Sequence, residues 1–408
     1  MMKKGLIPLL LIVLLFAAGC GHHGEETEVA VKAEKEAPAP ETVKEEPAAE
    51  TGPIKIGAIF GITGPASKLG EPERNTVEML VEKINASGGV NGRTLEVIIE
   101  DTEGAEQKAV EAVNKLLEKD GVCAIIGPTR SGPSMAVIPI MQKNETPLIS
   151  CAAADSIVEP IAERKWIFKT PQKNSSTAIQ IFNHMKTAGI TKVAIITGTT
   201  GFGKEGRDQL LRLAPTMGIT IVADETYNPP DTDMTAQLTK IKGTDAQAVI
   251  NWSIVPGQSI VPKNMKQLGM TIPLYQSHGF GNIAFANAAG DAAEGIIFPA
   301  GALLVADQLP ETYPRKAFLL EYKKDYEAKY GGEVSTFGGH AYDALMLLVE
   351  AIKTVGTDKA AIRDQLEKIQ NFVGTAGVFN MTPEDHTGLG DDAFELITVK
   401  GGKFVLLQ

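Results

Sequence analysis

The chain has 408 residues, of which 43% are hydrophobic, and a formal net charge of −11 at pH 7. This length is too great for one ordinary hydrophobic core and predicts two domains or lobes. The acidic balance and the lack of a basic patch argue against nucleic acid as a partner, because nucleic-acid-binding domains gather lysine and arginine on one face.

The first 20 residues, MMKKGLIPLLLIVLLFAAGC, have the pattern of an export signal. The apolar run at 5–16 is shorter than the roughly 20 residues that span a bilayer. The ending AAGC resembles the lipobox of bacterial lipoproteins, in which the cysteine, here Cys20, becomes the lipid-carrying N-terminus; Ala17 stands where leucine is commoner. The resemblance predicts a protein exported and lipid-anchored to a membrane outer face, in the periplasm or at the cell surface. An ordinary signal peptide with a chance cysteine is the alternative.

Residues 21–52 are expected to be a disordered acidic linker. They contain nine Glu, three Lys and no aromatic residue, so they cannot bury a core. A flexible chain of this length has an end-to-end distance of about 30 Å. Such a linker would hold a folded domain away from the membrane surface.

From Ile54 onward, apolar strand-like runs alternate with helical segments. This order predicts an α/β fold of two doubly wound, Rossmann-like lobes, whose parallel sheets are covered by helices on both faces. Long helices are expected at about 311–330 and 340–356. The predicted strands lie at 54–61, 94–101, 122–127, 146–151, 192–197, 219–225, 246–253, 273–279, 293–301, 394–400 and 403–408.

Two cysteines remain in this region, Cys123 near the start of one predicted strand and Cys151 at the end of the next. If these two strands are parallel neighbours, the two thiols lie at opposite strand ends. Several residues, each about 3.3 Å long, then separate them. A disulfide needs Cα atoms within roughly 7 Å. Both cysteines are therefore expected to be free and buried, with no redox role.

The segment TGTTGFGKEG at 197–206 contains a literal G-x-G-x-x-G between a predicted strand and a predicted helix. Asp224 and Glu225 follow about 20 residues later, as in a dinucleotide-binding unit. However, Gly198 and two threonines separate the strand from the first glycine of the motif, and an exported protein meets little NAD. A nicotinamide-dependent enzyme is therefore disfavoured, and no cofactor is expected.

No catalytic or metal-binding pattern emerges elsewhere. His278 and His340 adjoin glycines at the starts of loops or helices, but their spacing does not suit a zinc site. No G-x-S-x-G elbow or P-loop is present. The chain is not expected to be an enzyme. Its Gly-, Ser- and Thr-rich loops after the predicted strands could instead hold a carboxylate through backbone N–H groups.

The segment at 54–104 joins a first strand, the motif TGP and a helix that ends in INASGGVNG. It resembles the N-terminal signature of the periplasmic binding proteins of branched-chain amino-acid ABC importers. GVCAIIGP, TPLIS, FGKEG, AAEGII and HAYDALMLL follow in that family's order, so the resemblance covers residues 53–408. It implies a type I periplasmic-binding-protein fold, with two lobes on a three-segment hinge. Such proteins close on one small ligand and deliver it to a membrane permease with a cytoplasmic ATPase.

The resemblance also implies boundaries. Lobe 1 is expected to comprise 53–170 and 298–375, and lobe 2 to comprise 171–297 and 376–408. A monomer is expected.

Several site positions match the family's pattern. Ser131 falls where a hydroxyl holds the ligand carboxylate, and the backbone of Ala152 matches a further contact. Phe202 and Phe337 fall at aromatic wall positions, Phe202 in the loop that carries the family's ligand-stacking aromatic.

Other positions depart from it. Ala154 replaces a threonine that helps hold the ligand ammonium, Leu69 replaces an aromatic wall residue and Ile254 replaces a tyrosine. His278 replaces the acid that pairs with the α-ammonium. Arg130 adds a positive group. Together these residues predict a carboxylate-bearing ligand without an α-ammonium, such as an aromatic or aliphatic organic acid.

Three alternatives stay open. The alignment could slip by one residue, or another acid such as Glu205 or Asp155 could pair with an ammonium. In either case the ligand would be a branched-chain or other apolar amino acid, as for a leucine/isoleucine/valine-binding protein proper. It could also be a ligand-sensing subunit of a membrane receptor.

Overall fold

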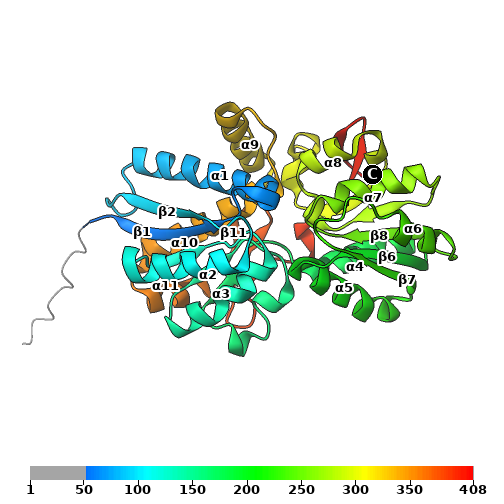
Figure 1. Ribbon diagram of the computed structural model, residues 1–408. Coiled ribbons are helices and arrows are strands. Elements are labelled where there is room, and N and C mark those ends of the chain that lie inside the picture. Colours follow the sequence, from blue (N-terminus) through cyan, green and yellow to red (C-terminus); the bar gives the residue numbers. More distant parts are fainter. Residues whose placement is uncertain (1–51, 408) are drawn as a thin grey trace, which may run out of the picture. The chain divides into compact units, whose positions relative to one another are not determined.

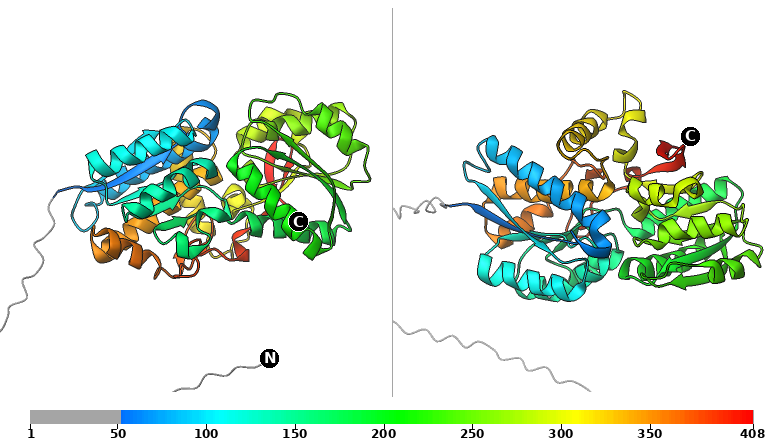
Figure 2. Two further views of the ribbon diagram at one scale, coloured as in Figure 1. Left: turned by 60° about the horizontal axis from the view of Figure 1, so that its bottom comes forward. Right: turned by 45° about the horizontal axis from the view of Figure 1, so that its top comes forward.

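The computed structural model describes residues 52–407, which belong to one compact unit. The predicted signal peptide, Cys20 and the predicted linker up to residue 51 lie outside the described residues. The strands form two large sheets and one small one. In Figures 1 and 2 the blue and cyan strands belong to one helix-covered sheet and the green strands to another.

The first sheet has five parallel strands in the order β2-β1-β3-β4-β5. Almost every residue of β1 is buried, as expected for a strand covered on both faces. The strands are β1 (Ile54–Phe60), β2 (Leu95–Asp101), β3 (Ala124–Ile126), β4 (Leu148–Ser150) and β5 (Ile167–Lys169).

Helices cover both faces of this sheet because side chains alternate along each strand. Ala58 and Phe60 of β1 pack in a cluster with α1 and α10, whereas Ile59 packs in a cluster with α2 and α3. The orange α10 therefore returns to the first sheet from far along the chain (Figure 1). These helices are α1 (Ser67–Ala86), α2 (Glu106–Lys115), α3 (Ser131–Lys143) and α10 (Thr336–Val355), with α11 (Lys359–Leu366) packed beside α10.

The second sheet has seven strands in the order β14-β13-β10-β9-β8-β6-β7. Its first five strands along the chain are parallel, and the last two pair antiparallel at one edge. They are β6 (Lys192–Gly198), β7 (Thr220–Tyr227), β8 (Ala248–Trp252), β9 (Leu274–Gln276), β10 (Ile297–Ala300), β13 (Glu395–Lys400) and β14 (Lys403–Leu406).

The chain joins the two sheets three times: after β5, after β10, and between β12 and β13. The predicted α/β class and doubly wound order are confirmed. The predicted lobe boundaries stay a prediction, although the membership of β10 in the second sheet favours a crossing after residue 300. The remaining elements are α4 (Asn174–Thr187), α5 (Gly201–Leu213), α6 (Thr235–Lys242), α7 (Gly257–Gln267), α8 (Ile283–Ala289), α9 (Lys316–Tyr330), β11 (Phe372–Val373) and β12 (Val378–Phe379).

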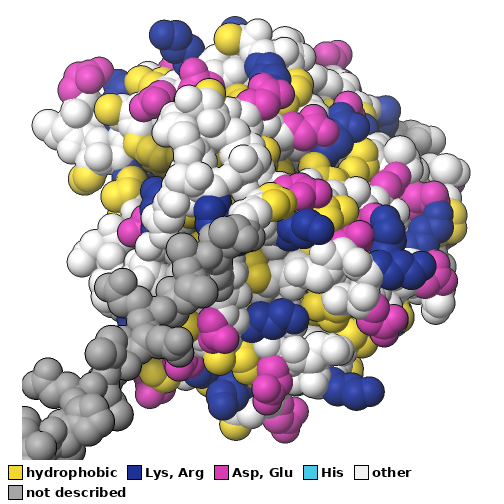
Figure 3. Space-filling view, turned by 90° about the vertical axis from the view of Figure 1, so that its left-hand side faces the viewer, with side chains coloured by type: hydrophobic (Ala, Val, Ile, Leu, Met, Phe, Trp, Pro, Cys, Tyr) yellow, Lys and Arg dark blue, Asp and Glu magenta, His cyan; other side chains and the backbone are white. Residues whose placement is uncertain are grey.

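Cys123 and Cys151 are both buried and do not form a disulfide with each other, as predicted. On the face shown in Figure 3, basic and acidic side chains are interspersed rather than gathered by sign. None of the helices within residues 52–407 is both long enough and apolar enough to cross a membrane.

Candidate ligand-binding cavity

A small cavity lies where strands of both sheets end, with about 20 Å³ of space open to the centres of water-sized molecules. In open α/β sheets the loops beyond the carboxyl ends of parallel strands are the usual place for a ligand. The first sheet and its helices contribute Thr129, Ser131, Cys151, Ala152, Ala153, Thr336, Phe337 and His340, the crossing after β5 contributes Pro171, and the second sheet contributes Phe202, Ile254, His278 and Gly279.

Six of the nine residues predicted to bind the ligand line this cavity. They come from positions as far apart as 131 and 337, and the fold brings them together. They are Ser131, Ala152, Phe202, Ile254, His278 and Phe337.

The other three predicted residues lie elsewhere. Leu69 is 1% exposed and packs in the apolar core. Ala154 contacts the site indirectly, because its N–H donates to Oγ of Ser131 over 3.4 Å. Arg130 lines an outer groove that shares Ser131 and Phe202 with the cavity. Its guanidinium donates to the carbonyl of Gly104 over 3.2 Å, and burial lowers its pKa against the opposing effect of Glu106.

Two helix N-termini meet beside the cavity, and each contributes a lining residue. Helix α3 begins at Ser131, and α5 begins at Gly201, next to Phe202. They approach so closely that a Cβ on Gly201 would lie 2.9 Å from the backbone nitrogen of Gly132. Helix N-termini carry partial positive charge and unpaired N–H groups, so this place favours an anion.

The glycine motif after β6 serves packing. A Cβ on Gly203 would lie 1.8 Å from the carbonyl oxygen of Gly198, and one on Gly206 would lie 2.1 Å from the indole nitrogen of Trp252. These glycines let α5 lie against the ends of β6 and β8. Asp224, which would hold a ribose in a dinucleotide site, instead accepts from Nε of Arg207 over 2.8 Å. The motif is therefore explained without a dinucleotide.

An aromatic cluster forms one wall of the cavity. The ring centroids of Phe202 and His278 lie 5.4 Å apart at an angle of 66°, and Trp252 packs edge-on against His278 at 5.9 Å. Such edge-to-face contacts fix ring orientation and add about 0.5–1.5 kcal/mol each. The wall is consequently rigid as well as apolar.

A buried cation lies behind the opposite wall. Nζ of Lys169 donates to the carbonyl oxygens of Ala153 and Pro171 over 3.1 and 2.7 Å, and both of these residues line the cavity. Burial lowers the pKa of Lys169 to about 8. Burial and Lys169 together lower the pKa of His340 to about 3, and burial, Lys169 and His340 hold the pKa of His278 well below its usual range. Both imidazoles are therefore neutral near pH 7.

The two alternative acids do not line the cavity. Glu205 accepts from Nε2 of Gln209 over 2.8 Å and from the amide of Asn174. Burial, reinforced by Asp155, raises the pKa of Glu205 to about 7. Asp155 in turn accepts from the backbone N–H of Ser175 over 3.3 Å. Both carboxyl groups serve a network that joins the two sheets rather than the ligand cavity.

Sequence reasoning missed other lining residues. Ala153 and Gly279 lie at or just after the ends of predicted strands, but nothing in the sequence distinguishes them from their neighbours. Thr129 and Cys151 have partners that only the fold shows. Thr129 donates to the buried carboxyl of Glu73, and the backbone N–H of Cys151 donates to the carbonyl of Pro128 over 3.3 Å. His340 was noted for its glycine neighbours, which was a usable signal. The two remaining lining residues, Pro171 and Thr336, gave none.

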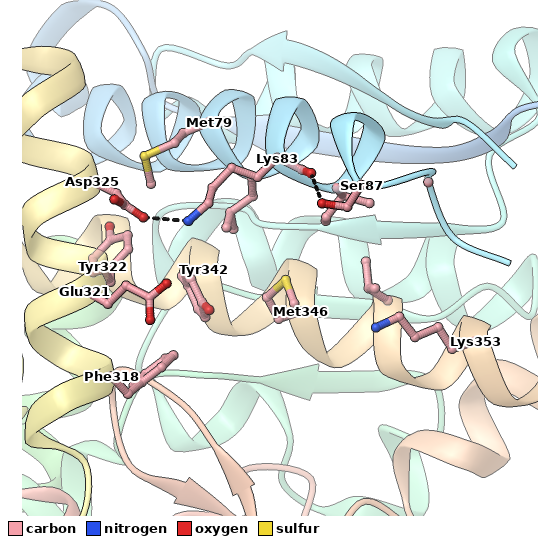
Figure 4. A pocket seen from close by; sticks show the side chains of 14 residues that line it. Met79, Lys83, Ser87, Phe318, Glu321, Tyr322, Asp325, Tyr342, Met346 and Lys353 are labelled. Atoms are coloured by element: carbon pink, nitrogen blue, oxygen red, sulfur yellow. Dashed lines mark hydrogen bonds and ion pairs between the residues drawn. The ribbon is translucent and has the colours of Figure 1, made fainter. Parts of the chain in front are cut away.

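A second hollow lies between α1, α9 and α10 (Figure 4). Met79, Tyr322 and Tyr342 point into it, and the Lys83–Asp325 ion pair at 2.5 Å bridges its rim. It lies on the outer side of helices, away from the strand ends. Its lining includes the acidic residues Glu321 and Asp325, which distinguishes it from the cavity at the strand ends.

Comparison with known proteins gives a consistent result. A sequence model of the family described as "Periplasmic binding protein" matches residues 53–403. The "Leucine-, isoleucine-, valine-, threonine-, and alanine-binding protein" of Pseudomonas aeruginosa is 26% identical over 306 residues, which cover 74% of this chain and 79% of that protein.

Solved structures are also similar. An extracellular ligand-binding receptor from Rhodopseudomonas palustris HaA2 superposes with a TM-score of 0.81 at 29% identity, covering 87% of this chain and 99% of that one. A second similar structure is the branched-chain amino acid transporter substrate binding protein LivJ from Streptococcus pneumoniae, solved in complex with isoleucine. It superposes with a TM-score of 0.74 at 27% identity, covering 86% of this chain and 97% of that one.

Proposed function

The chain belongs to the periplasmic binding protein family, and we propose that it is the solute-binding subunit of an ABC uptake system that captures a small carboxylate. The observation that carries the proposal is the meeting of the α3 and α5 N-termini beside a cavity without an acidic lining residue.

The carboxylate would lie against the helix N-termini. Oγ of Ser131 already accepts from Ala154, and its own proton has no acceptor among the described residues, so it can donate to the ligand. Each helix N-terminus is worth about 0.3–1 kcal/mol to an exposed anion and up to ~2 kcal/mol when partly buried. Lys169, behind the wall, adds positive potential.

The same features disfavour an α-ammonium. None of the thirteen described residues that line the cavity is acidic. A buried charge without a partner is costly, so an ammonium beside two neutral imidazoles and Lys169 would weaken binding. An aromatic or aliphatic organic acid fits the wall of Phe202, Phe337 and Ile254 better. A leucine/isoleucine/valine-binding protein proper is the second candidate, favoured by what the relatives' names say they bind.

Closure would proceed as a rigid-body hinge motion of two lobes about the three crossings. We propose that the lobe boundaries lie at these three crossings, which moves the predicted boundary at 298 to a point after β10 and the predicted boundary at 376 to a point after β12. The protein would be exported and monomeric, tethered by lipids on Cys20, and would pass its ligand to a permease with a cytoplasmic ATPase. If a receptor kinase rather than a permease is its partner, the closed form would act as a signal.

A thermal-shift screen of the purified protein tests the proposal. The panel holds leucine, isoleucine, valine and phenylalanine beside benzoate, phenylpyruvate and short-chain acids. A ligand at about 100 times its Kd adds about 2.7 kcal/mol, which moves Tm by several degrees. Shifts by acids that lack an ammonium support the proposal. Shifts by the amino acids alone would establish the second candidate instead.

A further inference from the structure

Two ring nitrogens on the cavity wall are buried and have no hydrogen-bond partner among residues 52–407. They are Nε2 of His278 and Nδ1 of His340, and both residues line the cavity. Buried polar atoms are nearly always paired, because an unpaired one has lost its hydrogen bonds to water without replacement. An unpaired nitrogen that faces a ligand cavity indicates a partner on the ligand.

Only for His278 does a neighbour fix the position of the ring proton. Oγ1 of Thr177 lies 3.0 Å from the carbonyl oxygen of Lys173 and 3.0 Å from Nδ1 of His278. A carbonyl oxygen can only accept, so both contacts are hydrogen bonds only if the hydroxyl proton points to Lys173. The ring proton of His278 then lies on Nδ1 and points to Thr177. Nε2 therefore presents a lone pair to the cavity, and it needs a donor.

The charges around His278 decide which donor suits it. Nζ of Lys169 and the ring of His340 are near enough to His278 to disfavour a positive charge there, and no lining residue is acidic. A ligand ammonium would therefore be buried without a counter-ion, which is costly. A hydroxyl group offers the same hydrogen bond at a much lower desolvation cost.

We propose that the ligand carries, besides its carboxylate, a hydroxyl group that donates to Nε2 of His278. His278 is then the residue that selects hydroxylated acids, and Thr177 is a positioning residue that holds the required tautomer. This inference rests on the proposed function, because it assumes a carboxylate ligand in this cavity.

Titration calorimetry on the purified protein separates the two ideas. The probes are benzoate, 3-hydroxybenzoate, 4-hydroxybenzoate and 4-fluorobenzoate, with propionate and lactate as an aliphatic pair. At least one hydroxylated acid should bind roughly tenfold more tightly than its parent, since one buried hydrogen bond is worth about 1.4 kcal/mol. The fluoro analogue accepts but cannot donate, so it should show no such gain.

Two variants link the gain to the proposed atoms. His278→Phe keeps an aromatic ring against Phe202 and removes the acceptor nitrogen, so the ratio of the Kd of the parent acid to that of the hydroxylated acid should fall to about one. Thr177→Val should reduce the preference and shift the ¹⁵N signals of His278 away from the pattern of an Nδ1-protonated ring. Thr187→Val is the matched control: Thr187 lies on the same helix and makes the same kind of bond, 3.1 Å to the carbonyl of Asn183, but is exposed.

The outcomes are distinct. If acids bind without a hydroxyl preference, or if the preference survives in His278→Phe, the inference fails while the proposed function stands. If His278→Phe does not fold, a preference unchanged in Thr177→Val together with an Nε2-protonated ring in the wild type overturns the inference. If no acid binds, both the inference and the proposed function fail.

Discussion

Substituting Gly201 with alanine should weaken ligand binding without weakening the fold. The added Cβ would lie 2.9 Å from the nitrogen of Gly132, about 0.5 Å inside ordinary contact. Gly201 belongs to the second-sheet half and Gly132 to the first, so the clash opposes approach of the two halves. Overpacking of this kind costs about 1–3 kcal/mol, which corresponds to roughly 5- to 150-fold in Kd.

The fold of each half should not suffer. Gly201 is the first residue of α5, is exposed and lacks a left-handed φ, so alanine fits the local backbone. Tm without ligand should therefore stay equal or rise slightly.

Calorimetry with the best ligand of the screen and small-angle scattering measure the two effects. The variant should bind more weakly and stay more open at equal ligand concentration. Gly332→Ala is the control, because a Cβ there meets nothing within 4 Å. An unchanged Kd and the same ligand-induced compaction as the wild type would refute the idea that these helix ends meet on closure.

Three further predictions concern charge and stability. His278→Glu should shift preference from organic acids towards α-amino acids, measured as a ratio of Kd values; an unchanged ratio would mean that this position does not contact the ammonium. Glu205 ionises near pH 4.5 when unfolded and near pH 7 when folded, so stability should fall by up to about 3 kcal/mol as pH rises across that window and then level off. Glu205→Gln should flatten this dependence of stability on pH, measured by urea unfolding at several pH values. If the wild type and the variant lose stability in parallel as pH rises, Glu205 is not the group responsible. Asp343 accepts from the N–H groups of Thr375 and Ala376 over 2.6 and 2.9 Å. Asp343→Ala should therefore lower the free energy of unfolding by about 3 kcal/mol while ligand affinity is retained. A loss below about 1 kcal/mol would show that water replaces the carboxylate.

The fold class could be predicted from the sequence because its signals are local. The buried runs that became β1 and β6 are nearly uninterrupted in apolar character, and helical segments separate them at regular spacing. The expectation that Cys123 and Cys151 do not pair with each other is also correct, since their places at opposite strand ends follow from the same pattern.

The site was only partly predictable, because its polar atoms depend on three-dimensional pairing. The sequence places Arg130 beside Ser131, which lines the cavity. The guanidinium of Arg130 instead donates to the carbonyl of Gly104. Leu69 packs in the buried core and does not line the cavity. Lys169 gave no signal, because its charge matters only through the two carbonyl groups that hold it behind the cavity.

The most direct test of the account compares matched pairs that differ only at the α-carbon. The purified protein is titrated with leucine and its 2-oxo acid, and with phenylalanine and phenylpyruvate. A cavity with two helix N-termini and no acidic lining residue predicts that an oxo acid binds at least tenfold more tightly than its amino acid, a difference of about 1.4 kcal/mol. Tighter binding of the amino acid in both pairs would contradict the account and identify a branched-chain amino-acid-binding protein of the ordinary kind.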